Sequence, residues 1–347
     1  MKTYASLKDR VWFDGQLTRL ITGSPLSSLN SKRLFEMIFS ENIPFQKSKT
    51  VLLLLARRGE TADELLGCLQ ALQKLEKPIG PKIPSLMDTC GTGGDGRHTL
   101  NVSTLVALVI AGAGGKVAKH GNRAISSKSG SSDLMESFGI KLNATSKKTT
   151  KAIKRCGLGY FHAPFYHPVF AKMQPLRRSL KRRTILNLLG PLTNPMRLDH
   201  QLVGVSCKRH VSLYAKVLAS LGRKSSLVCH SLNGMDEIST EIPTRAAWVT
   251  PGKIRTSIIR PRQYGLKKAS IKDIRVDSVK KSRTMAENIL SGKEHGPARD
   301  MIILNAAFGL FLCRKAKTIS EGIRLAQESL ASGKAANVLK QLKEITN

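Results

Sequence analysis

The sequence predicts an α/β protein in two parts, a small all-helical domain and a larger α/β domain with a mainly parallel sheet. Apolar residues follow helical spacing through the first 80 residues, and short apolar runs then alternate with helical segments. A stretch rich in proline and glycine separates these two regions. The length of 347 residues also suggests two domains.

In the amino-terminal part, apolar residues recur at i, i+3, i+4 and i+7 in four segments that we expect to be helices: 17–21, 31–40, 49–59 and 61–76. Thr61 and Glu64 have the spacing of a capping box at a helix start. The KPIGP run that follows predicts a boundary, so we assign residues 1–80 to the helical domain. A later helical pattern interrupts the strand–helix alternation, and we expect about 176–200 to return to this domain.

The larger domain is expected to comprise 81–175 and 201–347. Five short apolar runs in it are expected to be strands: 85–90, 116–121, 200–207, 225–231 and 299–307. Helical segments such as 104–114 and 209–222 lie between them. Strand–helix–strand alternation favours parallel pairing of the strands.

Charge is the unusual feature of the composition. Lys and Arg total 57 against 24 Asp and Glu, which gives a net charge of +33 and a pI near 10.3. Such a field attracts polyanions: phosphorylated metabolites, nucleic acids or acidic membranes. The alternative is a solvated surface with no dedicated partner, and charge alone does not choose between these interpretations.

The remaining composition excludes several classes. With 41% hydrophobic and 23% charged residues, the chain is neither collagen-like nor wholly disordered. Because no run of eighteen apolar residues occurs, we expect no membrane span, and the first fifteen residues lack the apolar stretch of a secretory signal. The six cysteines are scattered without a CxxC pair, which is typical of reduced thiols, so we expect a cytoplasmic protein.

The most specific motif is GTGGDG at 91–96, followed by NVST at 101–104. Glycines let the backbone approach a phosphate, and the helix start that follows supplies unpaired N–H groups. A plain glycine turn is the alternative, but four glycines in six residues disfavour it. The motif is neither a Walker loop nor a GxGxxG dinucleotide site. It therefore indicates phosphate binding.

A second motif, KHGNR at 119–123 with SSKSGSSD at 126–133, follows another predicted strand. It places a cation, an imidazole, an amide and several hydroxyls where α/β sheets bind ligands. Taken alone, a solvated basic loop is an equally good interpretation. Beside the glycine loop, an anion site is favoured.

A third motif is the doublet Asp236 and Glu237 after a glycine turn. Adjacent carboxylates supply the hard oxygen ligands that Mg²⁺ prefers. An ordinary acidic turn is the better interpretation of a bare doublet. However, acidic residues are scarce in this chain, which makes the pair more notable.

A fourth region is basic, with five cationic side chains in 177–183 ahead of the run TILNLLGPLTNP. Arginine can hold a carboxylate through two parallel hydrogen bonds, although most of such a cluster is expected to be exposed surface. The nearby His167 carries moderate weight, because a lone histidine is more often packed than catalytic.

Together these motifs resemble the anthranilate phosphoribosyltransferase family. The likeness rests on GTGGDG with NVST, KHGNRAISSKSGSSD, YHP, RTILNLLGPLTNP, GMDEIS and EHGPARDMIILNAA, in this order, and runs from near residue 55 almost to the carboxyl end. The corresponding loops of the related pyrimidine nucleoside phosphorylases read differently.

The resemblance implies a fold of the nucleoside phosphorylase and phosphoribosyltransferase class. It also implies an enzyme of tryptophan biosynthesis, a glycosyltransferase that joins anthranilate to phosphoribosyl pyrophosphate (PRPP) and releases pyrophosphate. Members resemble homodimers whose site lies in the cleft between the two domains.

The resemblance also implies roles for individual residues. PRPP would be held by Gly91, Gly94, Asp95, Thr99, Asn101, Ser103, Thr104, Lys119, Gly121, Asn122, Arg123, Ser127 and Ser131. Anthranilate would be held by Gly91, His120, Asn122, His167, Arg177, Gly190 and Pro191. The Mg²⁺ cofactor would be held by Ser103, Asp236 and Glu237.

Three positions depart from the family pattern near the acceptor channel or the metal loop. Lys181 stands where the family usually has glycine, His162 replaces an apolar aromatic residue, and Ser231 replaces a glycine. The net charge of +33 is also unlike a typical member.

Two rival functions are considered. A nucleic-acid-binding protein is disfavoured because the basic residues are spread along the chain without a known module, so we expect only weak, non-specific binding of nucleic acid. A nucleoside phosphorylase is disfavoured because the sequences of its corresponding loops differ from those of this chain.

Overall fold

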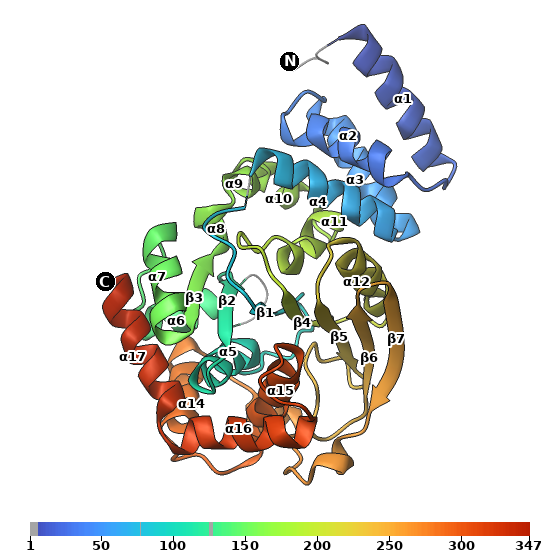
Figure 1. The fold of residues 1–347 in the computed structure, drawn as a ribbon. Coiled ribbons are helices and arrows are strands. Elements are labelled where there is room, and N and C mark those ends of the chain that lie inside the picture. Colours follow the sequence, from blue (N-terminus) through green and yellow to red (C-terminus); the bar gives the residue numbers. More distant parts are fainter. Residues whose placement is uncertain (1–5, 77, 125–127) are drawn as a thin grey trace. The chain divides into compact units, whose positions relative to one another are not determined.

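The computed structural model describes residues 6–76, 78–124 and 128–347, and its secondary structure is mixed α/β (Figure 1). The predicted fold class, a helical part with a larger α/β part and a mainly parallel sheet, is confirmed. No helix in these ranges is both long and apolar enough to cross a membrane.

The chain divides into two compact units. Unit 1 comprises Met1–Pro78 and His167–Thr193, and unit 2 comprises Ile79–Tyr166 and Asn194–Asn347. The first segment of the helical unit ends at Pro78, whereas the sequence analysis assigned residues 1–80 to it. The chain returns to this unit at His167, ahead of the expected start near 176.

All regular secondary structure in the described residues of unit 1 is helical. Its elements are α1 (Leu7–Ile21), α2 (Ser28–Phe39), α3 (Phe45–Arg58), α4 (Ala62–Leu75), α9 (Pro168–Lys172), α10 (Gln174–Leu180), α11 (Ile185–Leu188) and the 3₁₀ turn η1 (Gly190–Leu192). Helices α2 and α4 pack closely, and α10 and α11 pack on α3. The apolar positions that predicted the helices, such as Leu34, Leu52 and Leu65, are fully buried.

The predicted capping box at the start of α4 is confirmed and extends further than the sequence indicated. The Glu64 N–H donates to Oγ1 of Thr61 at 3.2 Å, and the Thr61 N–H donates to Oε2 of Glu64 at 2.9 Å. Oε1 of Glu64 also accepts the Leu26 N–H at 2.9 Å, and Arg58 pairs with Oε2. This fully buried carboxylate therefore joins three segments of unit 1.

Unit 2 is built on a seven-stranded sheet of order β3-β2-β1-β4-β5-β6-β7. Its strands are β1 (Leu86–Gly91), β2 (Lys116–Gly121), β3 (Leu158–His162), β4 (His200–Gly204), β5 (Ser225–Ser231), β6 (Thr244–Thr250) and β7 (Lys253–Ile259). The first five strands in this order, β3, β2, β1, β4 and β5, pair in parallel. β6 pairs antiparallel with β5, and β7 pairs antiparallel with β6. Four of the five predicted strands are confirmed.

Helices cover the sheet. The remaining elements of unit 2 are α5 (Val102–Gly112), α6 (Ser131–Ser137), α7 (Ser146–Cys156), α8 (Ala163–Tyr166), α12 (Arg209–Ser220), η2 (Pro261–Tyr264), α13 (Ile271–Ile274), α14 (Val279–Leu290), α15 (Pro297–Leu312), α16 (Ile319–Ala331) and α17 (Lys334–Thr346). α15 packs on α5, β4 and β5, while α16 and α17 pack on α5, and α12 packs on β5, β6 and β7. The buried apolar residues of these elements form the main core.

The fifth predicted strand is wrong. The run 299–307 lies inside helix α15, whose residues are almost all buried. A continuous apolar run has the same pattern in a buried strand and in a buried helix, so periodicity could not separate the two. Pro297 at the first helical position was the available sign of a helix start.

We expect Glu64→Ala to destabilise unit 1 by about 3–5 kcal/mol, because it removes the carboxylate partner of Arg58 and the acceptor of the Leu26 and Thr61 N–H groups. Urea unfolding of the full chain in a Trp248→Phe background measures this, since Trp12 then reports on unit 1 alone. Asp63→Ala is the control, an exposed acid one residue away in the same helical turn. Equal, small shifts of the midpoint in both variants would contradict the account.

Candidate active site

The functional loops of unit 2 follow the carboxyl ends of parallel strands. β1 lies between β2 and β4, and β5 follows β4, all running in one direction. The glycine loop leaves β1 at Gly91, the serine loop leaves β2 at Gly121, and the acidic loop 233–237 follows β5. Three of the four predicted motifs therefore come to one edge of the sheet, where open α/β sheets bind ligands.

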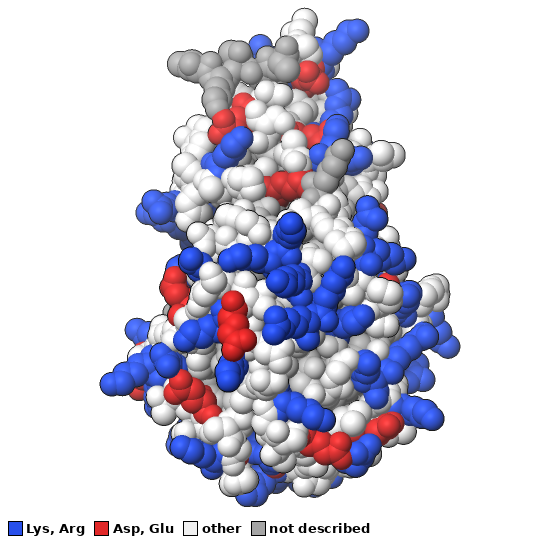
Figure 2. Space-filling view, turned by 60° about the vertical axis from the view of Figure 1, so that its left-hand side comes forward, with Lys and Arg blue, Asp and Glu red and all other residues white. Residues whose placement is uncertain are grey.

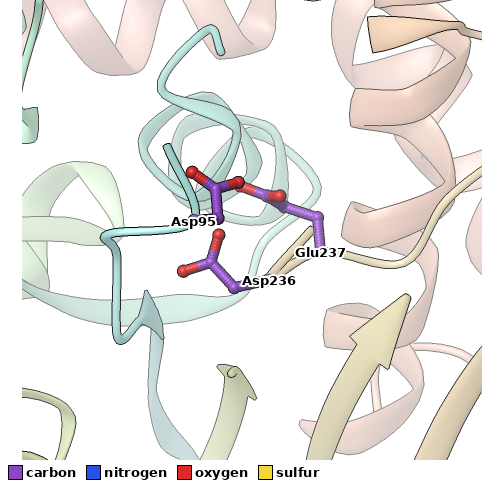
Figure 3. A group of neighbouring side chains, drawn as sticks. All are labelled: Asp95, Asp236 and Glu237. Carbon is purple, nitrogen blue, oxygen red and sulfur yellow. The ribbon is translucent and has the colours of Figure 1, made fainter. Parts of the chain in front are cut away.

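A cluster of three carboxylates lies at this edge (Figure 3). Oxygens of Asp95, Asp236 and Glu237 lie within 4.8 Å of one another. The predicted doublet is therefore joined by Asp95 of the glycine loop, for which the sequence indicated only a role in phosphate binding. The sequence carries no signal for this meeting, because Asp95 lies far from the doublet along the chain.

Desolvation and mutual repulsion raise the pKa values of two members. The pKa of Asp236 is raised mainly by burial, with the charge of Asp95 adding to the effect. The pKa of Glu237 lies well above its ordinary value, because burial and then the charges of Asp236 and Asp95 disfavour its ionised form. A cation placed among these groups would remove both penalties.

The donor set fits a hard divalent cation. Oδ2 of Asp95 and Oε2 of Glu237 are buried and have no hydrogen-bond partner among the described residues. A cavity of about 20 Å³ is lined by Ser103, Asp236, Glu237 and other residues, and a single water needs roughly 10–15 Å³. Carboxylate and hydroxyl oxygens are the ligands that Mg²⁺ takes in proteins.

Asp236 is held by backbone that approaches it closely. The Gly93 N–H donates to its Oδ2 at 2.8 Å. A Cβ at Gly91 would lie 2.3 Å from that same oxygen, and a Cβ at Gly204 would lie 1.4 Å from the Asp236 carbonyl oxygen. Any larger residue at either position must displace Asp236. Gly91 belongs to the predicted site, whereas Gly204, at the end of β4, was missed.

Asn305 of α15 holds the acidic loop from the other side. Its Oδ1 accepts the Ile238 N–H at 2.9 Å, and its amide donates to the Ile238 carbonyl oxygen at 2.8 Å. Both backbone groups next to Glu237 are therefore fixed by one side chain. Sequence reasoning missed this role, although an Asn inside an apolar helical run was the available signal.

The glycine loop is tied to the serine loop at the start of α5. Asn101 precedes the helix, and its amide donates to Oγ of Ser129 at 3.0 Å and of Ser282 at 3.2 Å. The predicted residues Ser103 and Thr104 lie in the first turn of α5. Gly94 lies in the loop with φ +71°, and Thr99 bridges to Arg275.

The end of β2 carries a buried charge network. Lys119 is only 2% exposed, and its Nζ donates to the His120 carbonyl oxygen at 3.1 Å. The carboxylate of Asp88 accepts the His120 N–H at 3.3 Å and the Asn194 amide at 3.0 Å. Burial raises the pKa of Asp88, and the charge of Lys119 opposes that shift. Asp88 and Asn194 were not predicted as site residues, yet they fix the strand end that presents Lys119 and His120.

The serine loop is organised by Ser131 at the start of α6. Oγ of Ser131 accepts the Asn122 N–H at 3.1 Å and donates to the Asn122 carbonyl oxygen at 3.2 Å. The loop therefore closes on itself, with Gly121 and Asn122 at its entry. Ser127, predicted to bind PRPP, lies outside the described residues.

Arg123 is engaged by acids of α6 rather than free in the loop. Its guanidinium donates to both carboxylate oxygens of Glu136, at 2.7 and 2.9 Å, and to Asp133 at 3.1 Å. The hydrogen bonds to Glu136 are the main cause that raises the pKa of Arg123. A phosphate that recruits Arg123 must compete with these two carboxylates.

His162, one of the departures from the family pattern, joins this loop through hydrogen bonds. Its Nδ1 lies 2.8 Å from Oγ of Ser132, which lies 2.8 Å from the hydroxyl of Tyr160. That hydroxyl in turn donates to Oγ of Ser131 at 3.2 Å. An apolar aromatic residue at 162 could not make the first of these bonds.

The remaining predicted acceptor residues belong to unit 1. His167 is buried, and its Nδ1 lies 2.7 Å from Oε2 of Glu76, so it is a paired residue of this unit. Gly190 and Pro191 form the η1 turn. Arg177 on α10 is half-buried, with its guanidinium 5.8 Å from the ring centroid of Phe170.

Arg177 lies at a partly buried position on α10. Burial lowers its pKa, and no carboxylate pairs with it in the part of the chain that the structure describes. Lys181, at the end of the same helix, has φ 51° and ψ 17°, the left-handed region that favours glycine. The structure thus gives a backbone reason for the glycine that the family usually has there.

Comparison with known proteins places the chain clearly. Residues 83–336 match the family described as "Glycosyl transferase family, a/b domain". The anthranilate phosphoribosyltransferase of Petrotoga mobilis is 38% identical over 335 residues, covering 96% of this chain and 97% of the relative. That of Persephonella marina is 39% identical, covering 94% and 97%.

Solved structures agree. The crystal structure of the Thermus thermophilus anthranilate phosphoribosyltransferase has a TM-score of 0.89 at 34% identity, covering 95% of this chain and 98% of that one. The Saccharomyces cerevisiae enzyme in complex with PRPP and Mg has a TM-score of 0.88 at 26% identity, covering 97% and 98%. By sequence and by fold, this chain belongs to the anthranilate phosphoribosyltransferase family.

Proposed function

We propose that this protein transfers the phosphoribosyl group of PRPP to the amine of anthranilate, releasing pyrophosphate, as a step of tryptophan biosynthesis. The observation that carries the proposal is the cluster of Asp95, Asp236 and Glu237 beside a glycine loop, in a chain of net charge +33. Three carboxylates gathered in so basic a protein favour a metal-bound, phosphate-rich substrate. The relatives' shared name supplies the acceptor, anthranilate.

PRPP is proposed to bind at the carboxyl edge of the sheet in unit 2. The glycine loop would offer backbone N–H groups to the phosphates, and Lys119 would offer a positive charge. The proposed contacts are Gly91, Gly94, Asp95, Thr99, Asn101, Ser103, Thr104, Lys119, Gly121, Asn122, Arg123, Ser127 and Ser131.

Mg²⁺ is the proposed cofactor, held by Ser103, Asp236 and Glu237, to which the geometry adds Asp95. Bound there, Mg²⁺ would supply positive charge to the oxygens of the departing pyrophosphate. Oδ2 of Asp95 and Oε2 of Glu237 lack a hydrogen-bond partner within the described residues, which supports this assignment. The yeast relative has been crystallised with PRPP and Mg, in line with the same chemistry.

The reaction breaks the bond between the anomeric carbon and pyrophosphate and forms a bond to the anthranilate nitrogen. The amine is already nucleophilic when neutral, so no activated serine or cysteine is needed. The protein's task is to stabilise charge on the leaving group and to hold the amine in line with the anomeric carbon. Lys119 is suited to the first task, because Asp88 and Asn194 fix the end of its strand.

Anthranilate is proposed to contact Gly91, His120, Asn122, His167, Arg177, Gly190 and Pro191. Arg177 is the proposed partner of the anthranilate carboxylate, since its guanidinium lacks a carboxylate partner among the described residues. Nucleic acid is proposed to bind only weakly and without specificity, and the enzyme is proposed to work in the cytoplasm.

The proposed reaction is tested by incubating the purified protein with PRPP, anthranilate and Mg²⁺ and following the loss of anthranilate fluorescence together with pyrophosphate release. Stoichiometric loss of anthranilate and appearance of pyrophosphate supports the proposal. Release of pyrophosphate without consumption of anthranilate would mean that PRPP is hydrolysed by water, and it would contradict the proposed transfer to anthranilate.

We expect Arg177→Ala to raise the KM for anthranilate about ten- to a hundred-fold, with a much smaller effect on the KM for PRPP. A charge-assisted contact of this kind is worth roughly 1.5–3 kcal/mol. Steady-state kinetics with each substrate varied in turn measures the split, and Arg178→Ala is the matched control on the same helix. Equal losses for both substrates would instead indicate that Arg177 only supports the fold.

A homodimer is proposed on the apolar surface of unit 1. Leu7, Val11 and Ile21 on α1 and Leu29 on α2 are 64–77% exposed, and exposed apolar side chains of this kind are candidates for a protein–protein interface. We expect Val11→Asp with Leu7→Asp to yield a monomer in analytical ultracentrifugation, whereas Ile254→Asp on the exposed strand β7 should not. A wild-type chain that sediments as a monomer at micromolar concentration would contradict the proposal.

A further inference from the structure

Unit 2 carries a groove that none of the predicted functions uses. It lies along helix α7, between that helix and the segment at Gly80 and Pro81, and has a volume of about 610 Å³. Four cationic side chains line it: Lys147, Lys151, Lys154 and Arg155. No residue of the proposed catalytic loops contributes to the lining.

The four cations share one side of the helix. Positions 147, 151, 154 and 155 are spaced i, i+4, i+7 and i+8, so their side chains project in similar directions over about 12 Å of helix. All four are exposed, and α7 contains no acidic residue. Within the described ranges, none of the four forms an ion pair. Like charges one turn apart repel, so this arrangement disfavours the helix unless an anion neutralises it.

The surrounding surface strengthens the field. α7 is drawn on the left-hand side of Figure 1, and Figure 2 turns that side forward. Lys and Arg side chains gather there at the height of α7, with few acidic side chains between them (Figure 2). The groove therefore lies on a face of unit 2 that is rich in positive charge.

The groove also offers neutral groups. The hydroxyls of Ser146 and Thr150 line it, and no hydrogen bond from either side chain occurs within the described chain. Gly80, Pro81 and the methylene stems of the lysines provide apolar surface. Charged, hydroxyl and apolar groups together are what a pocket for a phosphorylated small molecule needs.

We propose that this groove binds a small molecule that carries a chain of two or three phosphates, such as a nucleoside polyphosphate. Its volume lies within the roughly 300–1,000 Å³ of small-molecule sites, and four cations match the charge of such a chain. The groove is separate from the catalytic loops. α7 runs through Gly157 into the start of β3, so Lys154 and Arg155 lie near the amino-terminal end of that strand. The acidic cluster lies beyond the carboxyl ends of the parallel strands, at the opposite edge of the sheet.

The test is calorimetric titration of the full-length protein with inorganic tripolyphosphate and, separately, with ADP, at constant ionic strength. The groove variant is Lys147→Gln with Lys151→Gln and Lys154→Gln. The control is Lys216→Gln with Lys253→Gln and Lys272→Gln, which removes three exposed charges of unit 2 on α12, β7 and the helix α13. We expect the groove variant to lose one binding site for tripolyphosphate and for ADP, or to bind each at that site at least about tenfold more weakly. The affinities of the control variant should stay close to those of the wild-type protein.

Further readouts separate the alternatives. The KM for PRPP should be the same in the groove variant and the control, because none of the three lysines belongs to the proposed catalytic site. Equal loss of tripolyphosphate and ADP binding in both variants would show a bulk charge effect and overturn the proposal. If a single-stranded oligonucleotide, but neither small ligand, loses affinity only in the groove variant, the surface binds nucleic acid and the small-ligand proposal is wrong. The inference does not depend on the transferase reaction.

Discussion

Repulsion among three closely spaced carboxylates is the constraint on which the site in unit 2 depends. Carboxylate oxygens of Asp95, Asp236 and Glu237 lie within 4.8 Å of one another, in a chain that has only 24 acidic residues. Such a cluster is unfavourable at neutral pH without a cation, as the raised pKa values of Asp236 and Glu237 reflect. The fold holds it in place from several sides: Gly91 and Gly204 leave room for Asp236, and Asn305 fixes the backbone beside Glu237.

The pairing of a basic chain with an acidic cluster also accounts for the distribution of charge. The excess of Lys and Arg over Asp and Glu favours anionic substrates, whereas the acidic cluster gives the site a point of opposite sign. A substrate that carries both phosphates and a divalent cation is complementary to such a pattern. Lys119 lies close to Asp88 in the same buried region, so its charge is kept near the site without exposure to solvent.

Much of this could be predicted from the sequence, because local patterns carry the signal. The glycine loop, the serine loop and the acidic doublet were recognisable as motifs, and strand–helix alternation placed them at one edge of a parallel sheet. The capping box of α4 was equally local. In each case, neighbouring residues in the sequence decide the structure.

The features that sequence patterns did not predict depend on contacts between residues that lie far apart in the sequence. The run 299–307 was wrongly predicted as a strand, because full burial on all sides removes the periodicity that distinguishes a helix. Asp95 as a third acid, Gly204 and Asn305 act through residues remote in the chain, and no spacing rule reaches them. The groove along α7 likewise depends on Gly80 and Pro81 lying beside that helix.

The central claim, that the acidic cluster is a Mg²⁺ site, is tested most directly by calorimetric titration of Mg²⁺ at several pH values. Because the pKa values of Asp236 and Glu237 are raised, these carboxyls keep their protons to higher pH, and Mg²⁺ must displace them. The account predicts that Mg²⁺ affinity rises with pH above the ordinary titration range of carboxyl groups, with proton release on binding at the lower pH values. In Asp236→Asn with Glu237→Gln, the affinity should fall at least about tenfold and lose this pH dependence. Unchanged affinity and pH dependence in that variant would contradict the account.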